Sequence, residues 1–196
     1  VKLGGAAGRL PAPANRNVFT YTGEDRGPGL TGSVALSALA TSNSNITKPM
    51  LGLATSASDQ SRTDTINWGT GLNPSDGTPR LAIADILHSE PRLVAYVTDE
   101  DLQRVANSQA TPPTATSTER LVLFYGTNEG FINAIDPATG NEIFSFIPKE
   151  LLPNLNYYLN DPKGSAMKRY GMDGQLEMNV TYGAMSSNST RTVTQA

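Results

Sequence analysis

Residues Tyr125 to Pro148 read YGTNEGFINAIDPATGNEIFSFIP, and this stretch decides the fold. Apolar and polar residues alternate along it, and the segments TNEG and PATG interrupt the alternation with turn residues. Gly130 can take the positive φ that a tight hairpin often needs. Pro137 presets φ in the second turn, and Gly140 closes it. The stretch therefore predicts two hairpins that join three antiparallel strands in a meander.

Two apolar runs, PRLVAYVT at 91–98 and RLVLFYGT at 120–127, have the length expected of buried strands. Because the first run precedes the meander, we expect residues 90–147 to form one four-stranded sheet of the kind that repeats radially in a β-propeller. Residues 99–119, between the two runs, are polar and contain two adjacent prolines. They predict a solvent-exposed insertion loop.

A second unit begins at YGMDGQLEMNVTYG, residues 170–183, where a turn at Asp173 and Gly174 is expected to precede a strand. TRTVTQA at 190–196 predicts a further strand. Residues 85–196 would thus hold about one and a half propeller blades. Since neighbouring blades bury each other's faces, this portion cannot close a propeller, and we expect the chain to be a fragment of a larger all-β protein.

The first 84 residues are rich in Gly, Pro, Ser, Thr and Asn, and a loop-rich segment leading into the propeller is expected over 1–84. Ser58 can cap a short helix near 60–68, which Gly69 or Gly71 would end.

The side chains of this helix divide into two groups. Asp59, Arg62 and Thr63 are expected to face water, whereas Ile66 and Trp68 turn inward. Core anchoring is the expected role of Trp68, and a ligand-stacking platform is the alternative.

Composition restricts the classes of partner and of site. The chain has 196 residues, a formal net charge of −3 and no cysteine. This charge gives no broad cationic surface, so nucleic acid is not an expected partner. The lack of cysteine excludes a disulfide framework, a thiolate zinc site and a cysteine nucleophile, and it leaves the compartment open. No apolar run approaches the roughly 18 residues of a membrane span, and any export signal would lie outside this chain.

The second turn of the meander resembles the repeat of quinoprotein-like propellers, in which a glycine turn precedes an Ala-x-Asp-x-x-Thr-Gly segment. The matching residues here are Ala134, Asp136, Thr139 and Gly140. The Asp136 side chain can accept hydrogen bonds from turn amides, Thr139 can cap the same turn, and Gly140 takes the strained backbone position. These roles are structural.

A longer series of motifs resembles the PilY/PilC family of bacterial type IV pilus tip-associated proteins, and it runs from about Leu10 to Gly183. A helix expected over Lys149 to Leu159 separates this family from ordinary quinoprotein repeats. The quoted motifs are LPAPANRNVFTYTG, INWGTGL, DILHSEPRLVAY, GTNEGFINAIDPATGNEIFSFIPKELLPNL and YGMDGQLEMNVTYG.

The resemblance implies an exported bacterial protein at the cell surface, at the pilus tip or on the outer-membrane or periplasmic face. Its implied roles are pilus assembly, adhesion and surface sensing, with minor pilins as partners. Contact with host cells or abiotic surfaces would involve regions outside this chain.

A pyrroloquinoline-quinone-type oxidoreductase or a ligand-binding propeller is the alternative function. Such enzymes resemble one another in having many blade tryptophans, whereas this chain has one, and Phe144 and Phe146 stand where tryptophan is common. His88 is the only histidine, and Asp85 and Ser89 flank it. We expect a structural histidine, held through Asp85 or a backbone carbonyl, rather than part of a catalytic triad. No enzyme activity is therefore expected.

Members of the family are known to bind calcium in an EF-hand-like loop. Neither NPSDGTPR at 73–80 nor YGMDGQLE at 170–177 fits that pattern, because Pro74 and Gly171 stand where ligands should. Both are expected to be turns. No catalytic, cofactor or metal residue is predicted in this chain, and any calcium loop of the family would lie outside it.

Overall fold

The computed structural model describes residues 5–23, 36–86, 88–96, 120–161, 169–172, 174–178, 181–182 and 193–195. The strands in this part are β1 (Val18–Tyr21), β2 (Leu36–Ala38), β3 (Arg92–Tyr96), β4 (Arg120–Gly126), β5 (Ile132–Ile135), β6 (Glu142–Phe146), β7 (Thr181–Tyr182) and β8 (Val193–Gln195). The α-helices are α1 (Asp59–Gly69) and α3 (Pro153–Leu159), and the 3₁₀ turns are η1 (Ala6–Arg9), η2 (Pro13–Asn15), η3 (Pro49–Leu51) and η4 (Lys149–Leu151).

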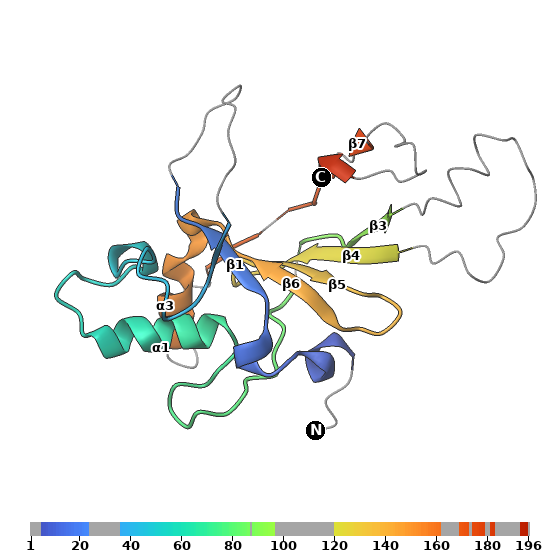
Figure 1. Cartoon of the computed structure of the whole chain (residues 1–196). Helices are drawn as coiled ribbons and strands as arrows, with labels where there is room; N and C mark the ends of the chain where they lie inside the picture. The colour runs from blue at the N-terminus through green and yellow to red at the C-terminus, as the bar shows by residue number, and fades with distance from the viewer. Residues whose placement is uncertain are drawn as a thin grey trace, which may run out of the picture.

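Strands β3 to β6 form the predicted antiparallel meander (Figure 1). Its register places Arg92, Phe124, Ala134 and Phe144 side by side across the four strands. A β-bulge interrupts the pairing of β5 with β6 between Ala134 and Ile135. The four predicted strands and their order are confirmed, and the insertion loop at 99–119 lies outside the described residues.

The sheet is wider than predicted, because the N-terminal segment adds two strands to it. The strand order is β2-β1-β6-β5-β4-β3, in which β1 runs parallel to β6 and β2 runs antiparallel to β1. Backbone hydrogen bonds from Ser145 N–H to Asn17 O (2.8 Å) and from Ile147 N–H to Phe19 O (2.9 Å) attach β1. The segment 1–84 is thus part of the sheet as well as a lead-in to it.

Helix α1 forms where the sequence predicted it. Ser58 Oγ accepts a hydrogen bond from the Ser61 N–H (3.1 Å), which is the expected N-cap. The helix ends at Gly69, and Gly71 follows with φ +94°. Ile66 is buried, as expected.

The prediction that Arg62 faces water is wrong. Its guanidinium donates hydrogen bonds to the carbonyl oxygens of Thr41 (3.0 Å), Asn43 (2.6 Å) and Ile46 (2.8 Å). The loop before the helix therefore wraps around this side chain. Carbonyl groups of a loop that turns back on itself need donors, and a long cationic side chain can supply several at once.

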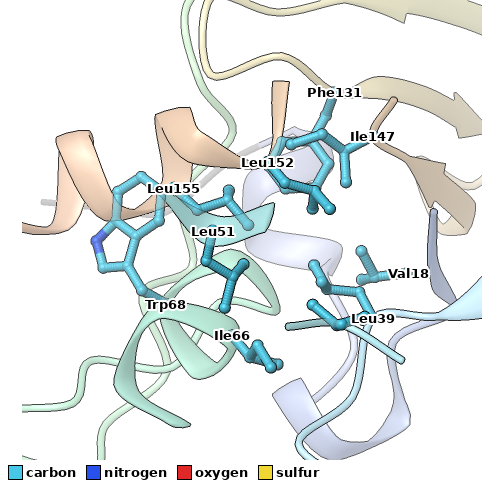
Figure 2. Close-up of a cluster of buried hydrophobic side chains, with 10 residues drawn as sticks. Val18, Leu39, Leu51, Ile66, Trp68, Phe131, Ile147, Leu152 and Leu155 are labelled. Carbon is cyan, nitrogen blue, oxygen red and sulfur yellow. The ribbon is translucent and has the colours of Figure 1, made fainter. Parts of the chain in front are cut away.

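The main core lies between the β1 side of the sheet and the two α-helices, which cross each other in Figure 1. Both halves of the chain contribute to it, and Figure 2 shows side chains from α1, α3 and the sheet converging. The buried cluster consists of Val18, Leu39, Ile46, Leu51, Ile66, Trp68, Phe131, Ile147, Leu152 and Leu155.

The helix expected over Lys149 to Leu159 is divided in two. The 3₁₀ turn η4 comes first, and α3 begins at Pro153, a residue that fits the first turn of a helix but not its interior. None of the helices in the described part of the chain has the length and hydropathy of a membrane span.

Part of the strand predicted after residue 174 forms among the described residues. Thr181–Tyr182 pairs with β8, whereas residues 175–178 are irregular. Leu176 and Met178 instead pack against the meander, where Arg92 Nε donates to the Leu176 carbonyl (2.9 Å). Asp173, the predicted turn residue, lies outside the described residues.

Candidate functional site

The β5–β6 turn contains the hydrogen bonds expected of the Asp-x-x-Thr-Gly segment. Asp136 Oδ1 accepts from the Ala138 N–H (2.8 Å), and Asp136 Oδ2 accepts from Thr139 Oγ1 (2.9 Å). Thr139 Oγ1 in turn accepts from the Asn141 N–H (3.2 Å), and Gly140 has φ +75°. The bonds from Ala138 and Thr139 lower the pKa of Asp136. These groups are occupied in shaping the turn.

The β4–β5 turn lies against the helices. Gly130 has φ +101°, and a Cβ placed there would lie 3.0 Å from Leu151 Cβ, so this turn requires glycine on two grounds. Thr127 Oγ1 accepts from the Phe131 N–H (3.2 Å). The predicted role of Gly130 in the hairpin is therefore supported by its backbone conformation.

Asp85 and His88, which the sequence analysis singled out, both lie near this turn but make different contacts. Asp85 Oδ2 accepts from Asn128 Nδ2 (2.8 Å), and its backbone oxygen accepts from the Asn128 N–H (3.0 Å). The exposed His88 ring lies 6.2 Å from the ring of Tyr170. Ser89 is buried, and its Oγ accepts from the Gly126 N–H (2.8 Å). Ser89 thus holds the C-terminal end of β4, and Asp85 holds the turn that follows it.

Trp68 is 9% exposed and belongs to the main core. The Arg80 guanidinium carbon lies 3.6 Å from the centroid of its ring, and the Tyr158 ring stacks with it at 6.3 Å. A cation and an aromatic ring of the protein therefore already contact the indole. This setting fits core anchoring better than a ligand-stacking platform.

Two arginines join the end of helix α1 to the sheet, and sequence reasoning missed both. Arg16 Nε and Nη2 donate to the two carboxylate oxygens of Glu142 (2.9 and 2.6 Å), and these side chains are only 10% and 2% exposed. Arg80 Nη2 donates to Glu129 Oε1 (3.0 Å). We call these four residues the arginine junction.

A further nitrogen of each arginine caps the helix. Arg16 Nη1 donates to the Thr70 carbonyl (3.1 Å), and Arg80 Nη1 donates to the Trp68 carbonyl (2.9 Å). Cations at a helix C-terminus are favourable, because unpaired carbonyls and the helix dipole give that end negative charge. Each arginine therefore binds a carboxylate of the meander and a carbonyl at the C-terminal end of α1.

Burial changes the acid–base properties of this region. It raises the pKa of Glu129, against the opposing effect of the neighbouring Arg80. Burial, together with the negative charge of Glu142, raises the pKa of Tyr125 to about 12. The polar groups near the junction thus lie in a medium much less polar than water.

Aromatic side chains line the face of the sheet opposite the main core. Tyr21 and Phe146 stack at 6.4 Å, and Phe124 and Phe144 meet edge to face at 6.2 Å. We call this surface the aromatic face and define it by register and strand alternation as Phe19, Tyr21, Val94, Val122, Phe124, Ile132, Ala134, Phe144 and Phe146.

The aromatic face is only partly covered in the described part of the chain. Val94, Phe124 and Ala134 are buried, and Leu176 and Met178 pack against that end. The other members of the face are half-buried. A sheet face of this composition is suited to packing against a further layer of protein.

A groove of about 630 Å³ opens between the β1–β2 ribbon and the end of α1. Val18, Leu39 and Ile66 are buried residues in its lining, and Asn17 and Asn67 are among its polar ones. Its charged lining residue is Arg16, which is paired with Glu142. The groove can receive an apolar, uncharged group.

The described residues contain no group of three or more His, Asp or Glu side chains placed to hold a metal ion. Residues 73–80 form the predicted turn, in which Asp76 Oδ1 accepts from the Thr78 N–H (2.9 Å) and a bridge pairs Leu72 with Pro79. The Asp76 carboxylate therefore stabilises its own turn through this hydrogen bond.

A stretch of 55 residues, 28% of this chain, is 38% identical to a type IV pilus biogenesis factor PilY1 homolog of Xylella fastidiosa (strain Temecula1 / ATCC 700964). The match spans 4% of the length of that protein. No family model matches the chain. No solved structure matches it. The similarity therefore relates a region of this chain to a small part of a pilus biogenesis factor.

Proposed function

We propose that this chain is part of a β-propeller that serves as an assembly and interaction platform in type IV pilus biogenesis. The aromatic face is the structural observation that carries the proposal, because it needs a neighbouring layer that the described residues supply only at one end. The similarity to a pilus biogenesis factor homolog supplies the biological context.

A propeller blade consists of four antiparallel strands joined in sequence order, and strands β3 to β6 of the six-stranded sheet are joined in this way. In a propeller, successive blades pack face to face around a centre. Leu176 and Met178 follow the meander in sequence and lie on its aromatic face, where the beginning of a next blade would lie. This arrangement supports a blade that packs against its successor.

The parent protein is proposed to be exported and to act at the cell surface, the pilus tip or the outer-membrane or periplasmic face, with minor pilins as partners. The role is adhesion and assembly without enzyme turnover, and calcium, where the family uses it, is bound outside this chain. An oxidoreductase or ligand-binding propeller is the competing function.

A deletion strain tests the proposal. Loss of the parent gene is expected to remove surface pili or attachment, and the intact gene is expected to restore them. A gene carrying His88→Ala serves as the matched control: it should also restore pili, since no catalytic role is assigned to this exposed histidine. Normal piliation of the deletion strain, together with quinone-dependent dye reduction by the purified parent protein, would favour the enzyme instead.

A further inference from the structure

A small cavity of about 20 Å³ lies beside the arginine junction. Its lining comes from four parts of the chain: Arg16, the end of α1 at Gly69, residues 80–84 and the β4–β5 hairpin. The polar side chains in the lining are Arg16, Arg80, Thr127, Glu129 and Asn133.

The hydrogen bonds around Ser145 indicate how the Asn133 amide is oriented beside this cavity. Ser145 Oγ lies 2.6 Å from the Asn133 amide oxygen and 2.8 Å from Glu142 Oε2. A serine hydroxyl has one proton, so it can donate to only one of these two acceptors. The network is satisfied when Ser145 donates to Glu142 and the Asn133 amide is turned so that its NH₂ group donates to Ser145.

In that arrangement the carbonyl oxygen of the Asn133 side chain has no partner among the described residues. Asn133 is 6% exposed, so few water positions can reach the group. A buried amide group without a hydrogen bond costs on the order of 1–3 kcal/mol. A donor inside the cavity would remove this cost.

Glu129 places a second acceptor at the same cavity. Its Oε1 accepts from Arg80, while its Oε2 has no partner among the described residues. A carboxylate can accept about four hydrogen bonds, and a buried one needs most of them. Arg80 also keeps N–H groups that its bonds to Glu129 and to the Trp68 carbonyl do not use.

We infer that this cavity is a hydration site holding one ordered water, which donates to Glu129 and Asn133 and accepts from an arginine N–H. The cavity volume suits one water molecule, which needs roughly 10–15 Å³ of free space and two to four polar partners. The arginines and glutamates of the junction carry balancing charges, so a neutral occupant fits better than an ion. The water connects the N-terminal segment with the meander.

A crystal structure of the whole chain at high resolution, from crystals soaked in sodium bromide, tests the site. The expected result is one density peak about 2.6–3.2 Å from the side-chain oxygens of Glu129 and Asn133, without anomalous signal from bromide. A bromide peak at this position would show that the site binds an anion and would contradict the proposed water. Absence of any peak between well-ordered side chains would overturn the site itself.

Oxygen-17 relaxation dispersion gives a second readout in solution, because it counts long-lived internal waters. Asn133→Leu is expected to lower that count by one relative to the unaltered chain. Ser145→Ala is the matched control, since it breaks the same side-chain contact but leaves the cavity lining in place, and the count should not change. Equal counts for the unaltered chain and a folded Asn133→Leu variant would contradict the proposal.

Discussion

At the scale of single residues, the β5–β6 turn could be predicted because all its partners lie within a few positions of one another. Asp136 and Thr139 bond to groups two or three residues away, and Gly140 supplies the left-handed conformation that closes the turn. Such interactions depend on short-range geometry, and residue types in a fixed spacing therefore identify them.

Gly140→Val is expected to destabilise the chain through backbone strain. The native φ of +75° is unfavourable for a β-branched residue, and the expected cost is roughly 1–3 kcal/mol. Crowding adds little, because the nearest atom to a Cβ here, Arg9 Cγ, is 3.7 Å away. Urea unfolding measures the change, with Ala138→Ser in the same exposed turn as the control. Equal midpoints for both variants would show that the turn does not require glycine.

Asp136→Ala is expected to destabilise the chain in a pH-dependent way. The turn bonds lower the folded-state pKa of Asp136, so its contribution is fully present above the unfolded pKa of about 4. That contribution is lost as the pH falls through the lowered folded pKa. The difference in thermal midpoint between the parent and the variant should therefore be full at pH 7 and shrink below about pH 4. A difference independent of pH would assign the effect to something other than the carboxylate charge.

The residues that sequence reasoning missed act over long separations. Arg62 was expected in solvent because its neighbours in the helix are polar, yet it binds carbonyls 16 to 21 residues earlier in the chain. Arg16 and Glu142 are 126 residues apart. No local pattern distinguishes such an arginine from one on the surface, since the partner is brought to it only by the fold.

At the scale of elements too, contacts between neighbours in sequence could be predicted, and contacts between distant segments could not. The meander β3–β6 is made of consecutive strands, so alternation and turn residues predict it. The parallel pairing of β1 with β6 joins elements more than 120 residues apart. Nothing in the β1 sequence VFTY indicates which strand it pairs with. The Arg16–Glu142 pair is the buried side-chain ion pair beside this strand pairing.

Glu142→Gln tests whether the junction holds β1 on the sheet. The variant keeps the shape of the side chain but leaves the buried Arg16 without a counter-charge, and the expected loss is about 3–5 kcal/mol. Lys48→Gln is the control, because it removes an ion pair whose partner Asp59 is 95% exposed, and it should change stability little. Urea unfolding compares the two. A Glu142→Gln variant as stable as the control would mean that backbone hydrogen bonds and apolar packing hold β1 without this ion pair.

At the scale of the whole molecule, the two faces of the sheet differ in how completely they are covered. Helices α1 and α3 cover the β1 side of one face, as Figure 2 shows from the side chains that meet there. The aromatic face is buried only where Leu176 and Met178 reach it. Strand alternation predicts two faces, but it does not reveal which of them a later part of the protein will cover.

Cysteine labelling of the intact parent protein tests whether a further layer packs on the aromatic face. This chain has no cysteine, so single introduced thiols report their own positions within it. Ile132→Cys places a thiol on the half-buried part of the aromatic face, and Ala138→Cys places one in the exposed β5–β6 turn. If a neighbouring blade covers the face, the thiol at 132 should react with a maleimide roughly tenfold or more slowly than the thiol at 138, because it reacts only after local opening. Equal rates in the folded parent protein would show that the aromatic face remains open, and the blade packing proposed here would then be wrong.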